Sequence, residues 1–310
     1  MYIIETKDLQ AIYPYIRSFP LPQSTSHKGQ NGKVLVVGGS SLFHGAVLWA
    51  AEAAALLADM THVASTEENN DVIRTLKTKW QAGIVIPQKD IPSYAEEDGV
   101  ILVGNGMMRG EKVEVHPTTP TPLAWDKILR LQDEGRFTWE SVYYLLTHFP
   151  DKQYVFDAGA LQMMEREWLT LCHKPALLTP HQEEFHRLFG VEVKQLSLEE
   201  KCAVVAKTAQ QYHSVILLKA IDDIVSDGKK TVIIRGGNAG LTKGGTGDLL
   251  AGIATGILTH TDVFTSAVFA SFLLKKTADE LFSMKGYWYS VHDLLQAFPG
   301  VLAGLTRARI

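Results

Sequence analysis

The chain has 310 residues, of which 46% are hydrophobic and 21% charged, and its formal net charge is -4. This composition is typical of a globular protein long enough for one large α/β domain, and it offers no basic surface for nucleic acid or an anionic membrane. Early acidic residues and the lack of an apolar run of membrane-spanning length predict a cytoplasmic protein with no membrane partner. Two widely separated cysteines, Cys172 and Cys202, predict reduced thiols.

Short apolar runs that each end in a turn-forming, small or polar residue predict the strands of a parallel sheet. Because these runs do not alternate with polar residues, they are typical of strands buried on both faces. A separate pattern predicts a hairpin, because the turn-forming dipeptide Asp227-Gly228 stands between the β-prone runs 224–226 and 231–234. In chain order, the five predicted parallel strands are residues 34–37, 83–86, 100–103, 154–156 and 215–218.

Three helical patterns accompany these strands. Residues 45–57 are rich in alanine and apolar on most sides, which predicts a buried helix, and residues 249–258 predict another. Residues 198–212 predict a third, with Ser197 as N-cap and Glu200 three residues later. Strands that alternate with helices indicate a three-layer α/β/α fold, in which a mostly parallel sheet has helices on both faces. Such sheets bind ligands beyond the carboxyl ends of their strands.

The segment 107–139 is richer in proline, threonine and charge than its surroundings, and it predicts a surface excursion between two strands. No repeat, low-complexity tract or linker marks a domain boundary elsewhere in the chain. We therefore expect residues 1–310 to form a single domain.

The most informative motif is Gly244-Gly245-Thr246-Gly247-Asp248, which leads into the last predicted helix. Bare backbone N–H groups at a helix N-terminus favour a phosphate, and glycines let the phosphate approach those donors. Asp248 would then lie beside the phosphate in the first helical turn, where a carboxylate can take a proton from a substrate hydroxyl. The spacing alone also allows a plain alternative, a flexible loop followed by a first-turn acid.

Other candidate residues follow the predicted strands and fall on the same edge of the sheet as the glycine motif. Lys219 could meet a nucleotide phosphate, although a solvated lysine at a strand end is common. The small residues after the first strand could let a ligand approach, although close packing of helix on strand explains them equally well. The remaining strand ends could be plain turns. These segments are Gly38-Gly39-Ser40 with Phe43-His44-Gly45-Ala46, Gly104-Asn105-Gly106, Asp157-Ala158-Gly159 and Leu217-Leu218-Lys219.

The segment Thr179-Pro180-His181-Gln182-Glu183-Glu184 allows two interpretations. A helix beginning here would place His181 and Glu184 about one turn apart on one face, where they could hold a polar group of a substrate and a metal-bound water. Alternatively, Thr179 is the N-cap, Pro180 the first helical residue, and the glutamates are favourable helix-start acids.

In order and spacing, these segments resemble the ADP/ATP-dependent NAD(P)H-hydrate dehydratases, a branch of the ribokinase-like superfamily. The resemblance extends from His27 to about Gly256, and it rests on the combination of motifs. The motifs are His27-Lys28-Gly29, the segment 32–46, Thr179-Pro180-His181-Gln182-Glu183-Glu184-Phe185, Leu217-Leu218-Lys219 and the segment 237–252.

This family repairs NADH and NADPH that have been hydrated on the nicotinamide ring. The resemblance implies that ADP or ATP phosphorylates the ring hydroxyl and that phosphate is then eliminated, with AMP released when ADP is the donor. It further implies a Mg²⁺ requirement, a homo-oligomer such as a tetramer, and no companion epimerase domain. Other readings of the same motifs are a ribokinase-like kinase acting on a vitamin precursor or another hydroxyl substrate, and a non-catalytic nucleotide-binding protein.

The resemblance also implies roles for individual residues. Asp248 would be the general base, and the backbone amides of Gly244, Gly245, Thr246 and Gly247 would form an anion hole for the transferring phosphoryl group. Lys219, Asn238 and Gly247 would contact the nucleotide. Ala46, Gly106, His181 and Asp248 would line the site of the hydrated cofactor. Glu184 would order Mg²⁺ through water, since Mg²⁺ keeps several of its own waters.

The sequence departs from the usual family pattern at several of these positions. The changes leave the implied base and anion hole in place but bear on substrate and nucleotide binding. Gly-Pro-Gly-Leu-Gly is replaced by Gly104-Asn105-Gly106-Met107-Met108, Asp-Ala-Asp by Asp157-Ala158-Gly159, Lys-Gly by Lys219-Ala220, and Gly-Ala-Gly by Ala58-Asp59-Met60.

Overall fold

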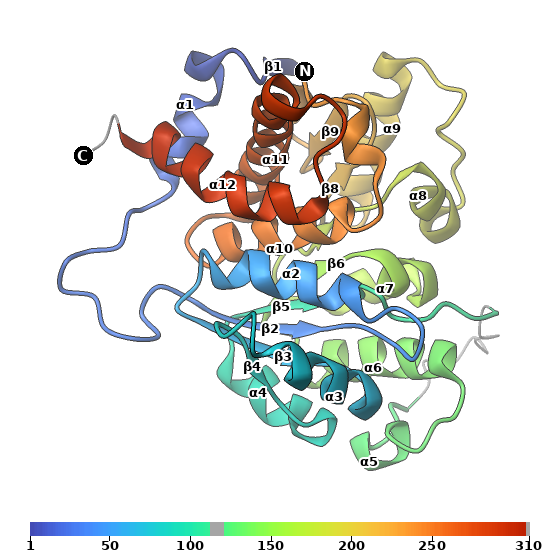
Figure 1. Cartoon of the computed structure of the whole chain (residues 1–310). Helices are drawn as coiled ribbons and strands as arrows, with labels where there is room; N and C mark the ends of the chain where they lie inside the picture. The colour runs from blue at the N-terminus through green and yellow to red at the C-terminus, as the bar shows by residue number, and fades with distance from the viewer. Residues whose placement is uncertain (112–120, 308–310) are drawn as a thin grey trace.

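A computed structural model describes residues 1–111 and 121–307. Its centre is one ten-stranded sheet with the strand order β1-β10-β9-β8-β7-β6-β5-β2-β3-β4 (Figure 1). Only β9 runs antiparallel to its neighbours, and the other strands are parallel to one another. The strands are β1 (Tyr2–Glu5), β2 (Lys33–Val37), β3 (Met60–Ala64), β4 (Ile84–Val85), β5 (Val100–Val103), β6 (Gln153–Phe156), β7 (Leu177–Leu178), β8 (Val215–Leu218), β9 (Asp223–Ser226) and β10 (Thr231–Arg235).

Helices cover both faces of this sheet and complete three layers (Figure 1). Adjacent residues of β2 show the division, because Val34 packs into the core on one face and Leu35 into the core on the other. The first face is covered by α1 (Leu9–Ser18), α2 (Gly45–Ala55), α10 (Thr246–Leu258), α11 (Val263–Lys285) and α12 (Val291–Thr306). The second is covered by α4 (Ile91–Glu97), α5 (Trp125–Ile128), α6 (Glu134–His148), α7 (Ala158–Met163), α8 (Gln182–Phe189) and α9 (Leu198–Gln211). The remaining helix, α3 (Glu67–Leu76), contacts β4, and three short 3₁₀ helices are η1 (Gln88–Asp90), η2 (Arg166–Leu171) and η3 (Ala239–Thr242).

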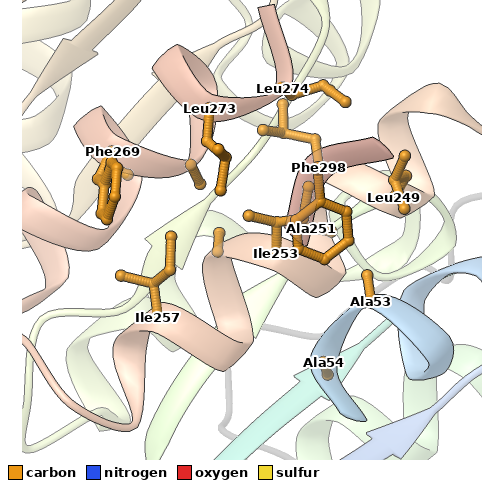
Figure 2. Packing of buried hydrophobic residues seen from close by; sticks show 14 of the residues in the cluster. Ala53, Ala54, Leu249, Ala251, Ile253, Ile257, Phe269, Leu273, Leu274 and Phe298 are labelled. Atoms are coloured by element: carbon orange, nitrogen blue, oxygen red, sulfur yellow. The ribbon is translucent and has the colours of Figure 1, made fainter. Parts of the chain in front are cut away.

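Close packing fixes α10, the helix that follows the glycine motif, against α2. A Cβ atom added at Gly252 would overlap the carbonyl oxygen of Ala50, and one at Gly256 would meet the Leu57 side chain at 2.6 Å. Glycines four residues apart therefore let the two helix backbones approach closely. Figure 2 shows the other side of α10, where Ile253 and Ile257 pack among side chains of α11, including Phe269 and Leu273. Helix α10 is thus held on several sides, which fixes the direction of its N-terminus.

Most of the predicted elements are confirmed. The predicted strands coincide with β2, β5, β6 and β8, while the run 83–86 contributes only the two-residue β4. The predicted hairpin is β9–β10, and Ser197 and Glu200 form the expected capping box of α9. Helix α10 begins at Thr246, three residues before the predicted start, so that Asp248 lies within its first turn. Both cysteines are free and buried.

The predicted surface excursion over residues 107–139 is confirmed for most of the residues that the structure describes, which are exposed or half-buried, but it is wrong where the stretch contributes side chains to the core. Met107 and Trp125 are buried, and Trp139 is only 2% exposed, inside the core beneath α6. Composition did not reveal these buried positions, because they are a minority of the stretch and are filled by large apolar side chains. Residues 112–120 of the stretch lie outside the described part of the chain. Among the described helices, none is both long enough and apolar enough to cross a membrane.

Candidate active site

The carboxyl ends of five parallel strands meet at one edge of the sheet, and each continues directly into a predicted motif. Gly38 follows β2, Gly104 follows β5, Asp157 follows β6, Thr179 follows β7 and Lys219 follows β8. His181 and Lys219 form a parallel bridge that extends the pairing of β7 with β8. The N-terminus of α10 lies at the same edge, where Asn105 contacts both Asp157 and Asp248. The structure therefore brings these sequence-predicted segments together.

The glycine motif forms a tight turn into α10. Gly245 is the N-cap and has a φ of 98°, a left-handed conformation that favours glycine. The Thr246 hydroxyl donates to the carbonyl oxygens of Leu241 and Lys243 at 2.8 and 2.9 Å, so this side chain secures the turn. The backbone N–H groups of Gly247 and Asp248 find no acceptor in the part of the chain that the structure describes. Unpaired donors at a helix N-terminus are suited to bind an anion.

Asp248 is a largely buried carboxylate in a crowded acidic setting. Its Oδ1 accepts a hydrogen bond from Asn105 Nδ2 at 2.8 Å, and the same nitrogen donates to Asp157 Oδ2 at 2.9 Å. Burial, and then the negative charge of Asp157, raise the pKa of Asp248 to about 6, against the opposing effects of Asn105 and Lys219. A carboxyl with this pKa is mostly ionised at neutral pH and is a stronger base than an ordinary aspartate.

Lys219 is the positive charge at the centre of the site. Its Nζ lies 2.7 Å from Asp157 Oδ1 and 3.8 Å from Glu184 Oε2. Burial lowers the pKa of Lys219, but the carboxylates of Asp157, Glu184 and Asp248 outweigh it and leave that pKa raised. Because a Cβ atom at Gly247 would be only 3.3 Å from the Lys219 ammonium, this cation lies directly against the first turn of α10. Lys219 therefore stays charged where a phosphate bound at that turn would be.

His181 and Glu184 are brought together, but as a capping box. The N-cap of α8 is His181, whose Nδ1 accepts from the backbone of Glu183 and Glu184, while Glu184 Oε2 accepts from the His181 N–H at 2.9 Å. The alternative with Thr179 as N-cap and Pro180 as first helical residue is thus wrong. The Thr179 hydroxyl instead donates to Asp157 at 2.9 Å, because it ends β7 beside that carboxylate.

A cavity of about 810 Å³ opens beside Asp248. Among the residues assigned to substrate or anion binding, Ala46, Gly106, Gly244, Gly245 and Asp248 line it. His181 does not; its side chain is 50% exposed and faces Glu184. Trp49 also lines the cavity and was not predicted, although its position three residues after Ala46, on the same helix face, could have revealed it. Leu42, Arg109 and Gln162 were not predicted either, whereas the other lining residues belong to motifs found in the sequence: Phe43, His44, Gly45, Met107, Met108, Ala158 and Gly159.

A second, smaller cavity of about 110 Å³ lies on the other side of the same helical turn. Lys219, Ala220, Thr246 and Gly247 line it, so Lys219 and Gly247, the two residues predicted to contact a nucleotide, share one cavity. Ala220 places its methyl group on this wall, at the position where the family usually has glycine. Asp248 belongs to the wall of the larger cavity, and the first turn of α10 therefore separates two compartments.

Asn238 does not line either cavity. Its Oδ1 accepts from the Tyr289 hydroxyl at 2.7 Å and from Gly240 N, and its Nδ2 donates to the Ala278 carbonyl. These bonds cap η3 and tie it to α11 and to the loop before α12. The side chain of Asn238 thus supports the segment leading to the glycine motif, and a nucleotide would meet it only after displacing these partners.

The described residues contain no group of three or more histidine, cysteine, aspartate or glutamate side chains arranged to hold a metal ion. Glu184, the predicted water-mediated ligand, is occupied on both oxygens, because Gln162 donates to Oε1 at 3.1 Å and His181 N–H to Oε2. This donor set fits an ion that keeps its own waters and is held mainly by phosphates, as Mg²⁺ commonly is.

The three-layer α/β/α architecture, with a glycine-rich helix N-terminus at the carboxyl ends of the strands, is a ribokinase-like fold, which the chain shares with solved proteins of that superfamily. The chain belongs to the NAD(P)H-hydrate dehydratase family, whose model matches residues 34–299, and this confirms the resemblance of the motifs.

Individual relatives and solved structures support the assignment of the chain to this family. The chain is 33% identical to the ADP-dependent (S)-NAD(P)H-hydrate dehydratase of Cenarchaeum symbiosum, over 94% of this chain and 96% of that protein. It is 27% identical to the bifunctional NAD(P)H-hydrate repair enzyme Nnr of Methanocaldococcus jannaschii, over 97% of this chain but 52% of that protein. The fold matches ADP/ATP-dependent NAD(P)H-hydrate dehydratase of Bacillus subtilis, crystallised with ATP and Mg²⁺, with a TM-score of 0.72, 23% identity, and coverage of 94% and 97%.

Proposed function

We propose that this chain restores hydrated NADH and NADPH to NADH and NADPH at the expense of a nucleotide. The donor is ADP, which yields AMP and phosphate, or ATP, which yields ADP and phosphate. Family membership supports this reaction, as does the name of the Cenarchaeum relative, an ADP-dependent (S)-NAD(P)H-hydrate dehydratase that matches nearly the whole chain.

The observation that carries the proposal is the place of Asp248 at the wall of the larger cavity, in the same helical turn as the unpaired N–H groups of Gly247 and of Asp248 itself. A cavity of about 810 Å³ lies within the range of small-molecule and cofactor sites. In the first step, the carboxylate of Asp248 takes the proton of the ring hydroxyl while the hydroxyl oxygen forms a bond to the terminal phosphorus and the nucleotide leaves. The ring carbon–oxygen bond then breaks and phosphate departs with its bonding electrons, while the adjacent ring carbon loses a proton, so that a double bond forms and the reduced ring is restored.

The backbone of the glycine motif provides the electrostatic part of this mechanism. The N–H groups of Gly244, Gly245 and Gly247 receive the negative charge of the transferring phosphoryl group, and Thr246 N–H joins them only by giving up its hydrogen bond to the Lys243 carbonyl. The charged Lys219 lies against Gly247. Lys219 and Gly247 bind the nucleotide from the smaller cavity, with Asn238 supporting the loop, while Ala46 and Gly106 line the site of the hydrated ring. His181 acts indirectly, by capping α8 and holding Glu184.

We assign Mg²⁺ to the nucleotide phosphates, with Glu184 reaching it only through water. When bound, Mg²⁺ would neutralise phosphate charge during transfer. The Glu184 carboxylate is held in place by its hydrogen bonds from Gln162 and from the His181 N–H of the capping box. It therefore presents a rigid acceptor to a water molecule of the ion. From the resemblance we also propose a cytoplasmic location and a homo-oligomer, the latter to be measured by sedimentation.

The proposal is tested by incubating the purified protein with NADH hydrate, Mg²⁺ and either ADP or ATP. The reaction is followed by the return of the absorbance of reduced nicotinamide. Recovery that depends on nucleotide is the expected result, and comparison of the two nucleotides identifies the donor. NADPH hydrate is tested in parallel. No recovery with either nucleotide, in a protein that still binds one of them, would contradict the dehydratase and indicate a kinase with another hydroxyl substrate.

A further inference from the structure

Asn105 makes two contacts that the rest of the mechanism leaves without a role. It is 0% exposed, and its single amide nitrogen donates to Asp248 Oδ1 at 2.8 Å and to Asp157 Oδ2 at 2.9 Å. An amide nitrogen carries two hydrogens, so each carboxylate receives one of them. Asn105 thus stands between two negative charges that would otherwise face each other across the site.

The backbone around Asn105 is fixed from two directions. Its carbonyl oxygen accepts a hydrogen bond from Gly39 N–H at 2.7 Å, and it lies so close to Gly38 that a Cβ atom there would overlap it. The flanking residues Gly104 and Gly106 have φ values of 125° and 73°, which favour glycine and produce the turn that directs Asn105 inward. The side chain is therefore aimed at the two carboxylates by its own loop.

The partner on the far side of Asn105 is equally well held. Asp157 accepts from Lys219 Nζ at 2.7 Å and from the Thr179 hydroxyl at 2.9 Å, both through Oδ1. Its Oδ2 is left for Asn105. A chain of hydrogen bonds consequently runs from Lys219 through Asp157 and Asn105 to Asp248, and it connects the ends of β8, β6 and β5 to the first turn of α10.

We propose that Asn105 is a positioning residue that anchors the Asp248 carboxylate to the Lys219–Asp157 pair and keeps it ionised for proton transfer. The inference rests on the proposed role of Asp248 as base. Proline, the usual residue of the family at this position, has no side-chain donor and cannot make either contact. Asn105 therefore supplies two hydrogen bonds that a proline at this position could not supply.

One detail separates this role from ordinary packing. Among the described residues, no donor reaches the buried Asn105 Oδ1. A buried asparagine retained for stability alone is expected to satisfy its oxygen as well as its nitrogen. Asn70 is such a residue, since it is also 0% exposed but donates to the Ile86 carbonyl and accepts from Ser65 N–H. Asn70 is thus a matched control.

The electrostatic effect of Asn105 has a definite sign. The charged groups around Asp248 are Asp157 from β6, Lys219 from β8 and Glu184 from α8. Burial and the two carboxylates raise the pKa of Asp248, whereas the Asn105 hydrogen bond and Lys219 lower it. Loss of the Asn105 donor should therefore raise that pKa further, and Asn105→Asp should raise it more than Asn105→Ala because it adds a third acid without changing size.

The test measures the titration of Asp248 directly, by carboxyl NMR of protein labelled with ¹³C-aspartate, with the signal assigned from Asp248→Asn. Asn105→Ala and Asn105→Asp are compared with the native chain and with Asn70→Ala. No substrate is needed, so this result stands even if the hydrated cofactors prove not to be substrates. We expect the Asp248 signal to titrate at higher pH in both Asn105 variants and at an unchanged pH in Asn70→Ala.

With an active enzyme, the dependence of kcat on pH gives the second reading. The acidic limb should move to higher pH in Asn105→Ala and Asn105→Asp, with kcat at neutral pH lower by about tenfold or more and KM nearly unchanged. Asn70→Ala should leave the shape of the profile unaltered even where it lowers the melting temperature. Asn105 variants whose Asp248 titration and pH profile both match the native chain would overturn the proposal.

Discussion

The backbone carbonyl of Met107 occupies the space in which a side chain at Gly159 would begin. The two residues belong to segments that both depart from the family pattern, Gly-Met-Met in place of Gly-Leu-Gly and Asp-Ala-Gly in place of Asp-Ala-Asp. The contact makes these departures compatible, since the loop after β5 lies against α7 only because residue 159 has no Cβ atom. Both residues also line the larger cavity, so the contact shapes its wall.

We therefore expect Gly159→Ala to push the Met107 loop away from α7. The added methyl group overlaps backbone and cannot be relieved by a rotamer change, so the free energy of unfolding should fall by about 1–3 kcal/mol. KM for the nicotinamide substrate should rise more than kcat changes, because the cavity wall moves while Asp248 does not. Urea unfolding and steady-state kinetics measure the two effects.

Gly304→Ala is the control for this substitution. Gly304 lies in α12 on an exposed surface, and a Cβ atom there meets nothing within 4 Å. Alanine is favoured over glycine in a helix by up to about 1 kcal/mol, so this variant should be as stable as the native chain or more so. Equal stability of the Gly159 and Gly304 variants would contradict the steric argument.

Asp248→Asn removes the proposed base while keeping the size of the side chain. Turnover should fall by about 10²–10⁴-fold, with the fold and nucleotide binding retained. In the native enzyme, kcat should decrease as the pH falls through about 6, because the carboxyl is then protonated. Asp293→Asn is the matched control, since Asp293 occupies the equivalent first-turn position of α12. Near-native rates in Asp248→Asn, measured by single-turnover kinetics, would remove Asp248 as the base.

The same substitution should stabilise the protein in a pH-dependent way. Asp248 has its pKa raised by burial from 3.8 to about 6, so the folded state holds its proton more tightly than the unfolded state does. Stability is therefore lost as the pH rises from about 4 to 6, and at neutral pH Asp248→Asn should regain up to about 3 kcal/mol. Below pH 4 the gain should vanish.

Asp293→Asn should behave in the opposite sense. The Lys285 ammonium and the Ser290 N–H hold the pKa of Asp293 low, at about 2, so its charged form is favoured in the folded state. Its contribution to stability is present above the ordinary aspartate pKa and is lost as the pH falls toward 2. Asp293→Asn should thus destabilise the protein at neutral pH. Unfolding curves of both variants at several pH values measure the two signs.

The sequence predicted those parts of the site that depend on local backbone. A glycine run before an apolar segment was enough to place Asp248 in the first turn of a helix, and four strand ends were enough to bring Lys219 to the same edge. Local patterns also found the capping box of Ser197 and Glu200. These features need only short-range geometry, and the structure confirms them.

Other features depended on contacts between distant segments. The donor role of Asn105 requires β5, β6 and α10 to converge, and no spacing rule reveals that its amide reaches both carboxylates. Likewise, the capping by His181 depends on β7 pairing with β8 through Pro180 and Lys219. The edge strand β1 escaped prediction because it is four residues long and half exposed, and it is defined by its pairing with β10.

A buried contact between a histidine and a carboxyl group, away from the candidate site, offers a test of the fold alone. His62 of β3 and Asp98, just before β5, are 2% and 0% exposed, and their nearest atoms lie 2.8 Å apart. His62→Ala leaves the Asp98 carboxyl buried without its partner, and we expect unfolding to require about 3–5 kcal/mol less. The pair of His173 with Asp151 has the same length, but its side chains are 61% and 83% exposed. His173→Ala should therefore cost less than about 1 kcal/mol. Neither histidine lines the larger cavity, so kcat of the folded enzyme should be unchanged in both variants. Similar losses in the free energy of unfolding from the two substitutions would show that burial does not decide how much such a contact stabilises the fold.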